Sequence, residues 1–224
     1  NQVDAFYGGA VAGAGDVNAD GYADVIVGAW GQSGEAGGEG RAYVYLGSTS
    51  GLGASAAWTA DPPDQAGAQF GRSVAGAGDV DGDGYADVIV GADRWNGAAG
   101  DEGGAYLYRG SASGPLAAPA WTAEPTDRAN AYYGVSVAGA GDVNGDGYAD
   151  VIVGAHRWDG AGTDEGRTYL YLGSASGIGA SAAGTADPTD QLEPRFCLQV
   201  AGAGDVNGDG FGDVIVGAPT WNGV

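Results

Sequence analysis

A repeat of 63 residues constrains the fold of this chain more than any other feature. The same nonapeptide opens at Asp16, Asp79, Asp142 and Asp205, and each copy begins 63 residues after the one before it. The 224 residues therefore hold three full units and part of a fourth, with boundaries near 11–73, 74–136, 137–199 and 200–224. Self-similarity at a period of this size is typical of solenoids and propellers, which stack one structural unit per repeat.

Each unit contains four strand candidates. In the first unit they are the small-residue run Val11–Gly15, the apolar run Asp24–Gly28, the aromatic segment Tyr43–Leu46 and Ala57–Ala60. Glycine-rich turns separate them, and the 47 glycines of the chain disfavour a helical core. The sequence therefore predicts an all-β protein, a β-propeller of four-stranded antiparallel blades, with three full blades plus the first half of a fourth. Alternate glycines in the first strand predict that it lies innermost, where backbones approach closely.

The repeated nonapeptide has the composition of a calcium loop. Oxygen-bearing side chains stand at its first, third, fifth and ninth positions, a glycine stands at the sixth, and the seventh residue could add a backbone carbonyl. Calcium takes six to eight oxygen ligands, and a tight loop supplies them by turning alternate side chains inward. The candidate ligands are Asp16, Asn18, Asp20, Tyr22, Asp24, Asp79, Asp81, Asp83, Tyr85, Asp87, Asp142, Asn144, Asp146, Tyr148, Asp150, Asp205, Asn207, Asp209, Phe211 and Asp213. We expect about four Ca²⁺ ions.

Other interpretations of the nonapeptide are weaker. An EF-hand needs a glutamate at the twelfth position and flanking helices, whereas the first loop has Val27 there and strands on both sides. The loops lack the His and Cys that zinc prefers, and magnesium tolerates irregular protein cages poorly. A metal-free Asp-Gly hairpin turn explains one copy, but four copies of the full set would place mutually repelling carboxylates together.

The balance of charge excludes one class of partner. The chain has 29 acidic residues, 8 arginines and no lysine, for a formal charge of -21. Nucleic acid is a poor candidate because its phosphates need a basic face. No segment reaches the roughly 20 continuous apolar residues of a membrane span. The single Cys197 is expected to be a small buried hydrophobe.

The order of motifs resembles a known family. Phe70-Gly71 and Tyr133-Gly134 precede a first strand, the acidic loop follows, and Gly217-Ala218-Pro219 closes a second strand. This order is similar to the FG-GAP repeat of integrin α-subunits and of related bacterial and fungal proteins. The resemblance implies a propeller of about seven blades, calcium in the loop between the first two strands, an extracellular or cell-surface location, and adhesion or ligand recognition. This sequence departs from the pattern at Phe196-Cys197, and at Trp30, Asp93 and His156 in place of the proline.

A second set of loops is the candidate ligand face. The loops that join second to third strands should lie opposite the calcium loops, and they repeat a tryptophan with polar neighbours. Aromatic faces beside hydrogen-bonding side chains commonly hold sugars. The candidate ligand-binding residues are Arg94, Trp95, Asn96, Arg157, Trp158, Asp159, Trp221 and Asn222. The alternative is that the tryptophans wedge between neighbouring blades, while Trp58 and Trp121 are expected in the core.

These observations predict a calcium-binding recognition module whose partner is a glycan or an extracellular protein. A structural spacer in a larger surface protein is the alternative, and a carbohydrate-active enzyme is a weaker one. His156 has no repeating partner, and the acid pairs Asp101-Glu102 and Asp164-Glu165 repeat as loop elements do. Because the fourth unit has no third or fourth strand, we expect either a homo-oligomer or the remainder of a longer chain.

Overall fold

A computed structural model describes residues 2, 4–34, 37–61, 65–124, 128–160, 162–187 and 195–219. Every regular element among these residues is a strand. The first blade contains β1 (Tyr7–Gly15), β2 (Asp24–Ala29), β3 (Arg41–Tyr45) and β4 (Trp58–Ala60). The second contains β5 (Ser73–Gly78), β6 (Asp87–Ala92), β7 (Gly104–Tyr108) and β8 (Trp121–Ala123), and the third β9 (Tyr133–Gly141), β10 (Asp150–Ala155), β11 (Arg167–Tyr171) and β12 (Gly184–Ala186). The half-blade is β13 (Gln199–Gly204) with β14 (Asp213–Gly217).

The strands of each blade follow one another in an antiparallel meander, as the repeat predicts. Hydrogen bonds order the first sheet β1-β2-β3-β4, and the other two full sheets have the same order. In the first blade Val27 pairs with Val11 on one side and with Tyr43 on the other. The second strand is therefore central in its sheet and buried on both faces, which explains its unbroken apolar run.

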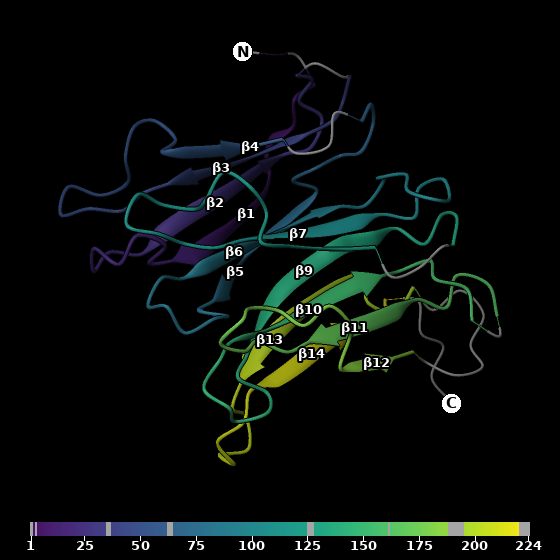
Figure 1. Cartoon of the computed structure of the whole chain (residues 1–224). Coiled ribbons are helices and arrows are strands. Elements are labelled where there is room, and N and C mark those ends of the chain that lie inside the picture. The colour runs from purple at the N-terminus through teal and green to yellow at the C-terminus, as the bar shows by residue number, and fades with distance from the viewer. Residues whose placement is uncertain are drawn as a thin grey trace.

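The innermost strands pack side by side, and their glycines permit the contact. Contacts join β1 to β5, β5 to β9 and β9 to β13, so the blades fan out from this row of strands (Figure 1). A Cβ atom added to Gly139 would lie 2.7 Å from the carbonyl oxygen of Gly76, and one added to Gly202 would lie 2.6 Å from that of Gly139. Side chains are excluded there, which confirms the prediction that the first strand is innermost.

Three apolar clusters fill the spaces between blades. The first joins Ile26 and Val44 of the first blade to Phe70 and Val90 of the second, and equivalent clusters join the second blade to the third and the third to the half-blade. Trp58 lies in the first cluster, where its indole N–H donates to Leu116 O of the next blade at 3.0 Å. Each blade therefore depends on its neighbour for a core.

The first strands of two blades begin earlier than the sequence predicts. β1 and β9 begin at Tyr7 and Tyr133, four residues before the small-residue runs. These aromatic residues join the strand because the backbone continues to pair with the end of the second strand, where Tyr7 lies opposite Ala29.

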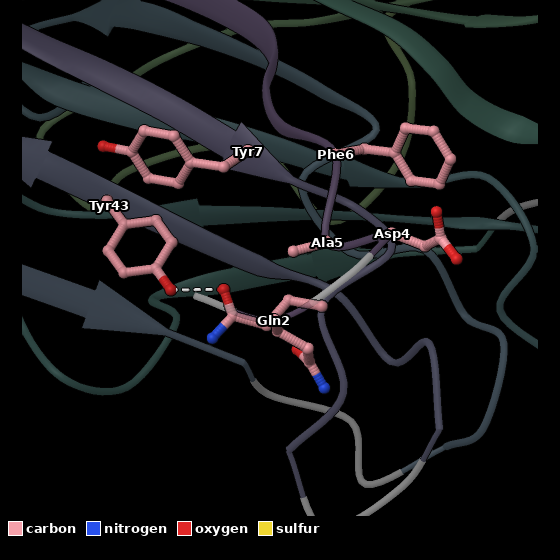
Figure 2. Close-up of a pocket in the computed structure, with 7 residues that line it drawn as sticks. Gln2, Asp4, Ala5, Phe6, Tyr7 and Tyr43 are labelled. Atoms are coloured by element: carbon pink, nitrogen blue, oxygen red, sulfur yellow. Dashed lines mark hydrogen bonds between the residues drawn. The ribbon is translucent and has the colours of Figure 1, made fainter.

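The first blade also has a pocket of about 500 Å³ that Tyr7 and Tyr43 line (Figure 2). Tyr7 is 54% exposed there, whereas Tyr133 is fully buried against a preceding blade.

Cys197 is buried, as the sequence predicts. Its thiol donates to Arg167 O at 3.1 Å, and burial raises the pKa of the thiol to about 12. A thiol in that state is a poor nucleophile at neutral pH. The part of the chain that the structure describes contains no helix long and apolar enough to cross a membrane.

Candidate metal centre

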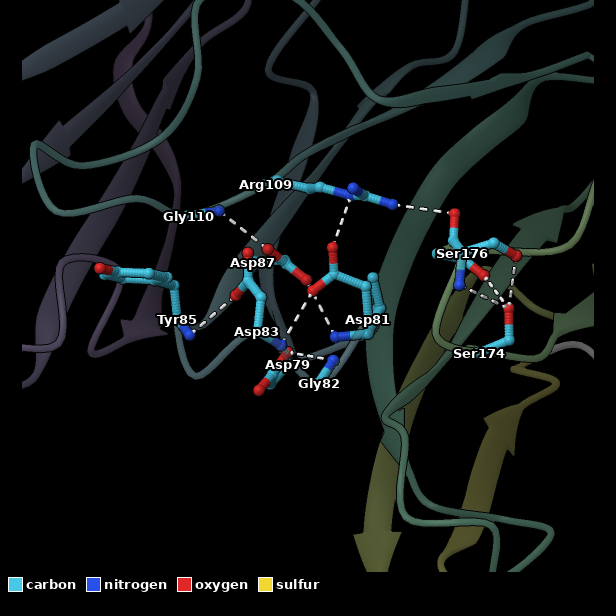
Figure 3. Close-up of polar contacts among 12 residues, drawn as sticks. Asp79, Asp81, Gly82, Asp83, Tyr85, Asp87, Arg109, Gly110, Ser174 and Ser176 are labelled. Carbon is cyan, nitrogen blue, oxygen red and sulfur yellow. Dashed lines mark hydrogen bonds and ion pairs between the residues drawn. The ribbon is translucent and has the colours of Figure 1, made fainter.

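The second nonapeptide brings three carboxylates together. Ligand oxygens of Asp79, Asp81 and Asp87 all lie within 4.8 Å of one another, at the end of the blade where β5 turns into β6 (Figure 3). Asp79 is held by three backbone donors, because Gly82 and Asp83 donate to Oδ1 and Gly84 donates to Oδ2. The loop thus points its carboxylates inward, as a calcium loop requires.

The ninth residue anchors each loop to its blade. In the second loop the buried carboxylate of Asp87 accepts from the backbone N–H of Val80 at 2.9 Å and of Gly110 at 2.8 Å. Asp24 and Asp150 make the equivalent pairs of bonds. One carboxylate therefore ties the loop to the end of the third strand.

The fifth and seventh residues close the loop in every copy. The N–H of the seventh residue donates to Oδ1 of the fifth, with distances of 3.0 to 3.1 Å across the copies that contain Tyr22, Tyr85, Tyr148 and Phe211. The third residue accepts from the N–H of the fifth, which involves Asn18, Asp81, Asn144 and Asn207. Coordination by the seventh carbonyl stays a prediction.

The carboxylates of the loops differ in how readily they ionise. Burial raises the pKa of Asp87 to about 6, and burial also raises the pKa of Asp150. In contrast, backbone N–H donors, Gly147 and Gly210 first, lower the pKa of Asp142 and Asp205. A cation in the loop would favour the ionised form of the buried carboxylates, because opposite charge offsets desolvation.

Neighbouring loops are linked to one another. The N–H of Ala86 donates to Asp16 O at 3.0 Å, and the N–H of Ala149 donates to Asp79 O at 3.0 Å. A Cβ added to Gly82 would lie 2.9 Å from the ring of Tyr148, so the aromatic seventh residue of one loop covers the loop before it. The first loop has Ala19 at the position of Gly82, and Ala19 keeps the same left-handed backbone at φ 56°.

The second loop has a positive neighbour that sequence reasoning missed. Arg109 Nε lies 2.9 Å from Asp81 Oδ2, and the Arg109 guanidinium also donates to Ser176 O of the next blade at 2.9 Å (Figure 3). Burial raises the pKa of Asp81 and Arg109 opposes that shift. The signal was present in the repeat, because Arg109 stands where the other full units have Leu46 and Leu172.

The loops between second and third strands lie at the opposite ends of the strands, as predicted. Arg94 and Asn96 are exposed and Trp95 is half-buried, whereas Trp158 is 8% exposed and belongs to the core cluster between blades two and three. The guanidinium carbon of Arg167 lies 3.3 Å from the centroid of the Trp158 ring. The two tryptophans are thus not equivalent, because Trp158 is buried and Trp95 is partly exposed. Trp221 and Asn222 lie outside the described residues.

Arginines gather at the same end of the inner strands. Arg72, Arg94 and Arg157 line a cavity of about 270 Å³ together with Tyr132 and His156. The guanidinium groups of Arg94 and Arg157 lie 5.9 and 5.4 Å from the centroid of the Tyr132 ring. Burial first, and then the nearby arginines, lower the pKa of His156 to about 4. In a chain of charge -21 this cavity is a local concentration of positive charge.

A glutamate that repeats in these loops is buried in each full blade. Glu39, Glu102 and Glu165 are 2 to 3% exposed, one in each full blade at the 63-residue period. Glu165 accepts from the N–H of Gly162 at 2.5 Å, and Glu102 accepts from that of Ala99 at 3.1 Å. The carboxylates of Glu102 and Glu165 therefore stabilise their own loops, as expected for repeated loop elements.

Comparison with known proteins gives a consistent family. The FG-GAP repeat model matches residues 7–45, 70–108, 133–171 and 199–224. Integrin alpha-4 of Xenopus laevis is 35% identical over 160 residues, which cover 69% of this chain and 15% of that protein. Integrin alpha-6 of Gallus gallus is 34% identical over 155 residues, which cover 66% of this chain and 13% of that protein. The chain thus spans only a small part of the length of these relatives.

Solved structures agree on the fold. The rhamnogalacturonan lyase YesW superposes with a TM-score of 0.54 at 16% identity, covering 92% of this chain and 39% of that one. A rhamnogalacturonan lyase of Bacillus licheniformis superposes with a TM-score of 0.52 at 17% identity over the same shares. At such identities the likeness concerns the fold alone. The repeat, the blade topology and the four matched segments agree, and this chain belongs to the FG-GAP repeat family, of the type found in integrin α-chains.

Proposed function

We propose that this chain is a calcium-stabilised recognition module of an extracellular or cell-surface protein. The observation that carries the proposal is the convergence of Asp79, Asp81 and Asp87, whose oxygens lie within 4.8 Å of one another in a loop that the chain repeats four times. The residues that would hold the ion are the first, third, fifth and ninth of each loop. Calcium would supply the positive charge that the loop carboxylates need, and the loops would then tie the first strand of each blade to the second.

The choice of calcium follows from the donor set. All the side-chain ligands are oxygens, and backbone N–H donors already orient the first and ninth carboxylates. Such a preformed cage of several carboxylates suits calcium better than magnesium, which keeps most of its water. Because the ion would bind the folded loop and not the unfolded chain, it would add stability by mass action.

The test is thermal unfolding with the metal content measured in parallel. We expect about four Ca²⁺ per chain at millimolar calcium, and a melting temperature that falls on chelation and recovers with Ca²⁺ but not with equal Mg²⁺. A protein whose metal content and melting temperature ignore the chelator would refute the calcium proposal.

For recognition, we propose the face opposite the calcium loops. Arg94, Tyr132 and Arg157 line a cavity there, and Trp95 lies in the loop that carries Arg94. Aromatic faces beside guanidinium groups suit a glycan with carboxylate substituents, since arginine binds carboxylates in a bidentate way. A glycan array with neutral and acidic sugars tests this ligand class, and an extracellular protein ligand is the alternative if no glycan binds.

We further propose that the module binds without catalysing a reaction. Glu102 and Glu165, the candidate acids of a glycosidase, accept hydrogen bonds from their own loops. The pKa of the His156 imidazole is lowered to about 4, so the ring would be uncharged at neutral pH. Release of products from polysaccharides on incubation with the purified chain would contradict this view.

A further inference from the structure

The cavity of about 270 Å³ at the end of the inner strands opposite the nonapeptide loops, which we call the arginine cavity, is lined by residues that depart from the family pattern. The position that holds Pro219 in the fourth unit holds Trp30, Asp93 and His156 in the other three. All three of these side chains line the arginine cavity. One position of the repeat thus supplies three different side chains to one cavity, so the chemistry of the cavity belongs to this chain and does not follow from the repeat.

Two buried polar atoms of the arginine cavity have no hydrogen-bond partner within the described part of the chain. They are Asp93 Oδ1 and His156 Nδ1. Asp93 is only 5% exposed, and its other oxygen, Oδ2, lies 3.7 Å from Arg72 Nε. A buried acceptor without a donor is unfavourable, so Asp93 Oδ1 marks a place for a donor of the ligand. A hydroxyl group can donate to the carboxylate oxygen and can also bond to an imidazole nitrogen.

Two arginines of the cavity lie on one aromatic ring and are not neutralised by an ion pair. The guanidinium groups of Arg94 and Arg157 lie 5.9 and 5.4 Å from the centroid of the Tyr132 ring. Among the described residues, none of the ion pairs between arginines and carboxylates includes Arg94 or Arg157. Guanidinium groups bind carboxylates through two parallel hydrogen bonds. These two side chains therefore favour an acidic group in the ligand.

The charge of the cavity disfavours a cationic ligand. Three arginines and one aspartate line it, and the guanidinium group of the third arginine, Arg72, lies 5.5 Å from the centroid of the Trp30 ring. A cationic group that entered the cavity would meet this excess of like charge, which costs binding free energy. The arginine cavity therefore selects an anion, and its aromatic rings already carry guanidinium groups of the chain itself.

We propose that the arginine cavity binds a single uronic acid residue of the ligand, with its carboxylate on Arg94 and Arg157 and a ring hydroxyl donating to Asp93 Oδ1. The volume of about 270 Å³ lies just below the range of roughly 300–1,000 Å³ for sites that enclose drug-sized ligands, so it suits one sugar residue. A uronic acid carries the two groups that the cavity calls for, an anion and a hydroxyl donor, on one ring. The inference rests on the proposed recognition face and names the sugar that this face would take.

The experiment uses the full 224-residue chain at pH 7 with calcium, and methyl β-D-glucuronide as the probe. His156 is the only histidine of the chain, so its ring signals in ¹H–¹³C NMR report on this cavity. We expect saturable shifts of these signals. Two matched probes each lack one group: methyl β-D-glucoside has no carboxylate, and cyclohexanecarboxylate has no hydroxyl. Each should bind about tenfold more weakly, as expected for the loss of a hydrogen bond to a charged group.

Variants test each contact. Arg157→Gln should weaken glucuronide binding about tenfold, whereas Arg128→Gln, which removes the same charge beside Trp158 and outside the cavity, should not. Asp93→Leu removes the acceptor and also a competing negative charge, so its effect is measured as a ratio: the preference for the glucuronide over cyclohexanecarboxylate should fall.

Three outcomes would overturn the inference. They are equal binding of the glucuronide and the glucoside, an Arg157→Gln variant that binds as well as the parent chain, and an unchanged ratio for a folded Asp93→Leu variant. Binding of neutral glycans on an array with no change at the His156 ring would also overturn it, and would leave the proposed recognition function standing.

Discussion

Arg109 and Asp81 form an ion pair at the second acidic nonapeptide loop, with Nε 2.9 Å from Oδ2. The other full blades have leucine and asparagine at these two positions, at Leu46 with Asn18 and at Leu172 with Asn144. The extra carboxylate of the second loop is thus matched by an extra positive charge from the third strand. The two changes together keep the net charge of the loop region equal among the three blades.

This pairing predicts a coupled effect of two substitutions. Arg109→Leu alone should lower the calcium-free stability by about 1 kcal/mol, because it leaves the crowded carboxylates without their counter-charge. The same change should raise calcium affinity at this loop, since a competing cation is removed. Asp81→Asn with Arg109→Leu should restore the stability, and urea unfolding in chelator measures the cycle. Additive losses would show that the pair is not coupled.

Removal of a single loop carboxylate should empty a single site. Asp83 is exposed and accepts from the N–H of Tyr85, so Asp83→Ala alters a loop without opening the core. We expect the calcium content to fall by about one ion per chain, with the remaining loops filled. Glu124→Ala, which removes a carboxylate on the opposite face, is the matched control and should leave the content unchanged. Loss of several ions would mean that the hydrogen bonds between neighbouring loops couple the sites.

His156 should make stability depend on acid pH. The pKa of His156 is about 4 in the fold and about 6.5 in an unfolded chain. The unfolded state therefore binds the proton more readily between these values, so stability falls as pH drops from about 6.5 to 4. Because the ring is partly exposed, we expect a loss of about 1–2 kcal/mol relative to His156→Gln over this range. Parallel unfolding curves of the two proteins at pH 7 and pH 4.5 measure it, and an unchanged difference contradicts the prediction.

Two of the three tryptophans predicted to bind a ligand, Trp95 and Trp158, should differ in the effects of their substitution. Trp158 is buried beneath Arg167, so Trp158→Ala should cost about 3–5 kcal/mol of folding free energy. Trp95 is half-buried beside a cavity, so Trp95→Ala should cost less and should reduce ligand binding. Chemical denaturation with a binding assay on the same samples distinguishes the roles. Equal losses of stability would place both residues among the wedges between blades.

Exposed apolar side chains on the outer blades predict self-association of the isolated chain. Val11 of the first blade is 65% exposed and Ile215 of the half-blade is 62% exposed, whereas the equivalent residues of the second and third blades are buried. We expect light scattering to report a mass above that of the monomer at high concentration. Val11→Glu with Ile215→Glu should reduce it, whereas Leu52→Glu, in an exposed turn, should not. A stable monomer of the parent chain at high concentration would contradict the prediction.

The repeat alone determined most of the architecture and of the acidic loops. The period of 63 residues located the strands, and the positions of Asp79, Asp81 and Asp87 within one nonapeptide made their convergence predictable, because a tight loop leaves few ways to turn alternate side chains. Trp58 and Cys197 were predicted to be buried from their residue types and contexts, and both are. Local pattern suffices for such features because each is formed within a few residues or within one repeated unit.

The tertiary structure decided which repeated residues lie on the surface and what they touch. Trp95 and Trp158 stand at equivalent positions, yet Arg167 covers one while Gly104 leaves a cavity beside the other. Arg109 reaches Asp81 only because the end of the third strand returns to the loop between the first and second strands. These contacts join residues far apart in sequence, so they depend on how strands and blades pack. A single sequence records the residues, and their partners follow only from that packing.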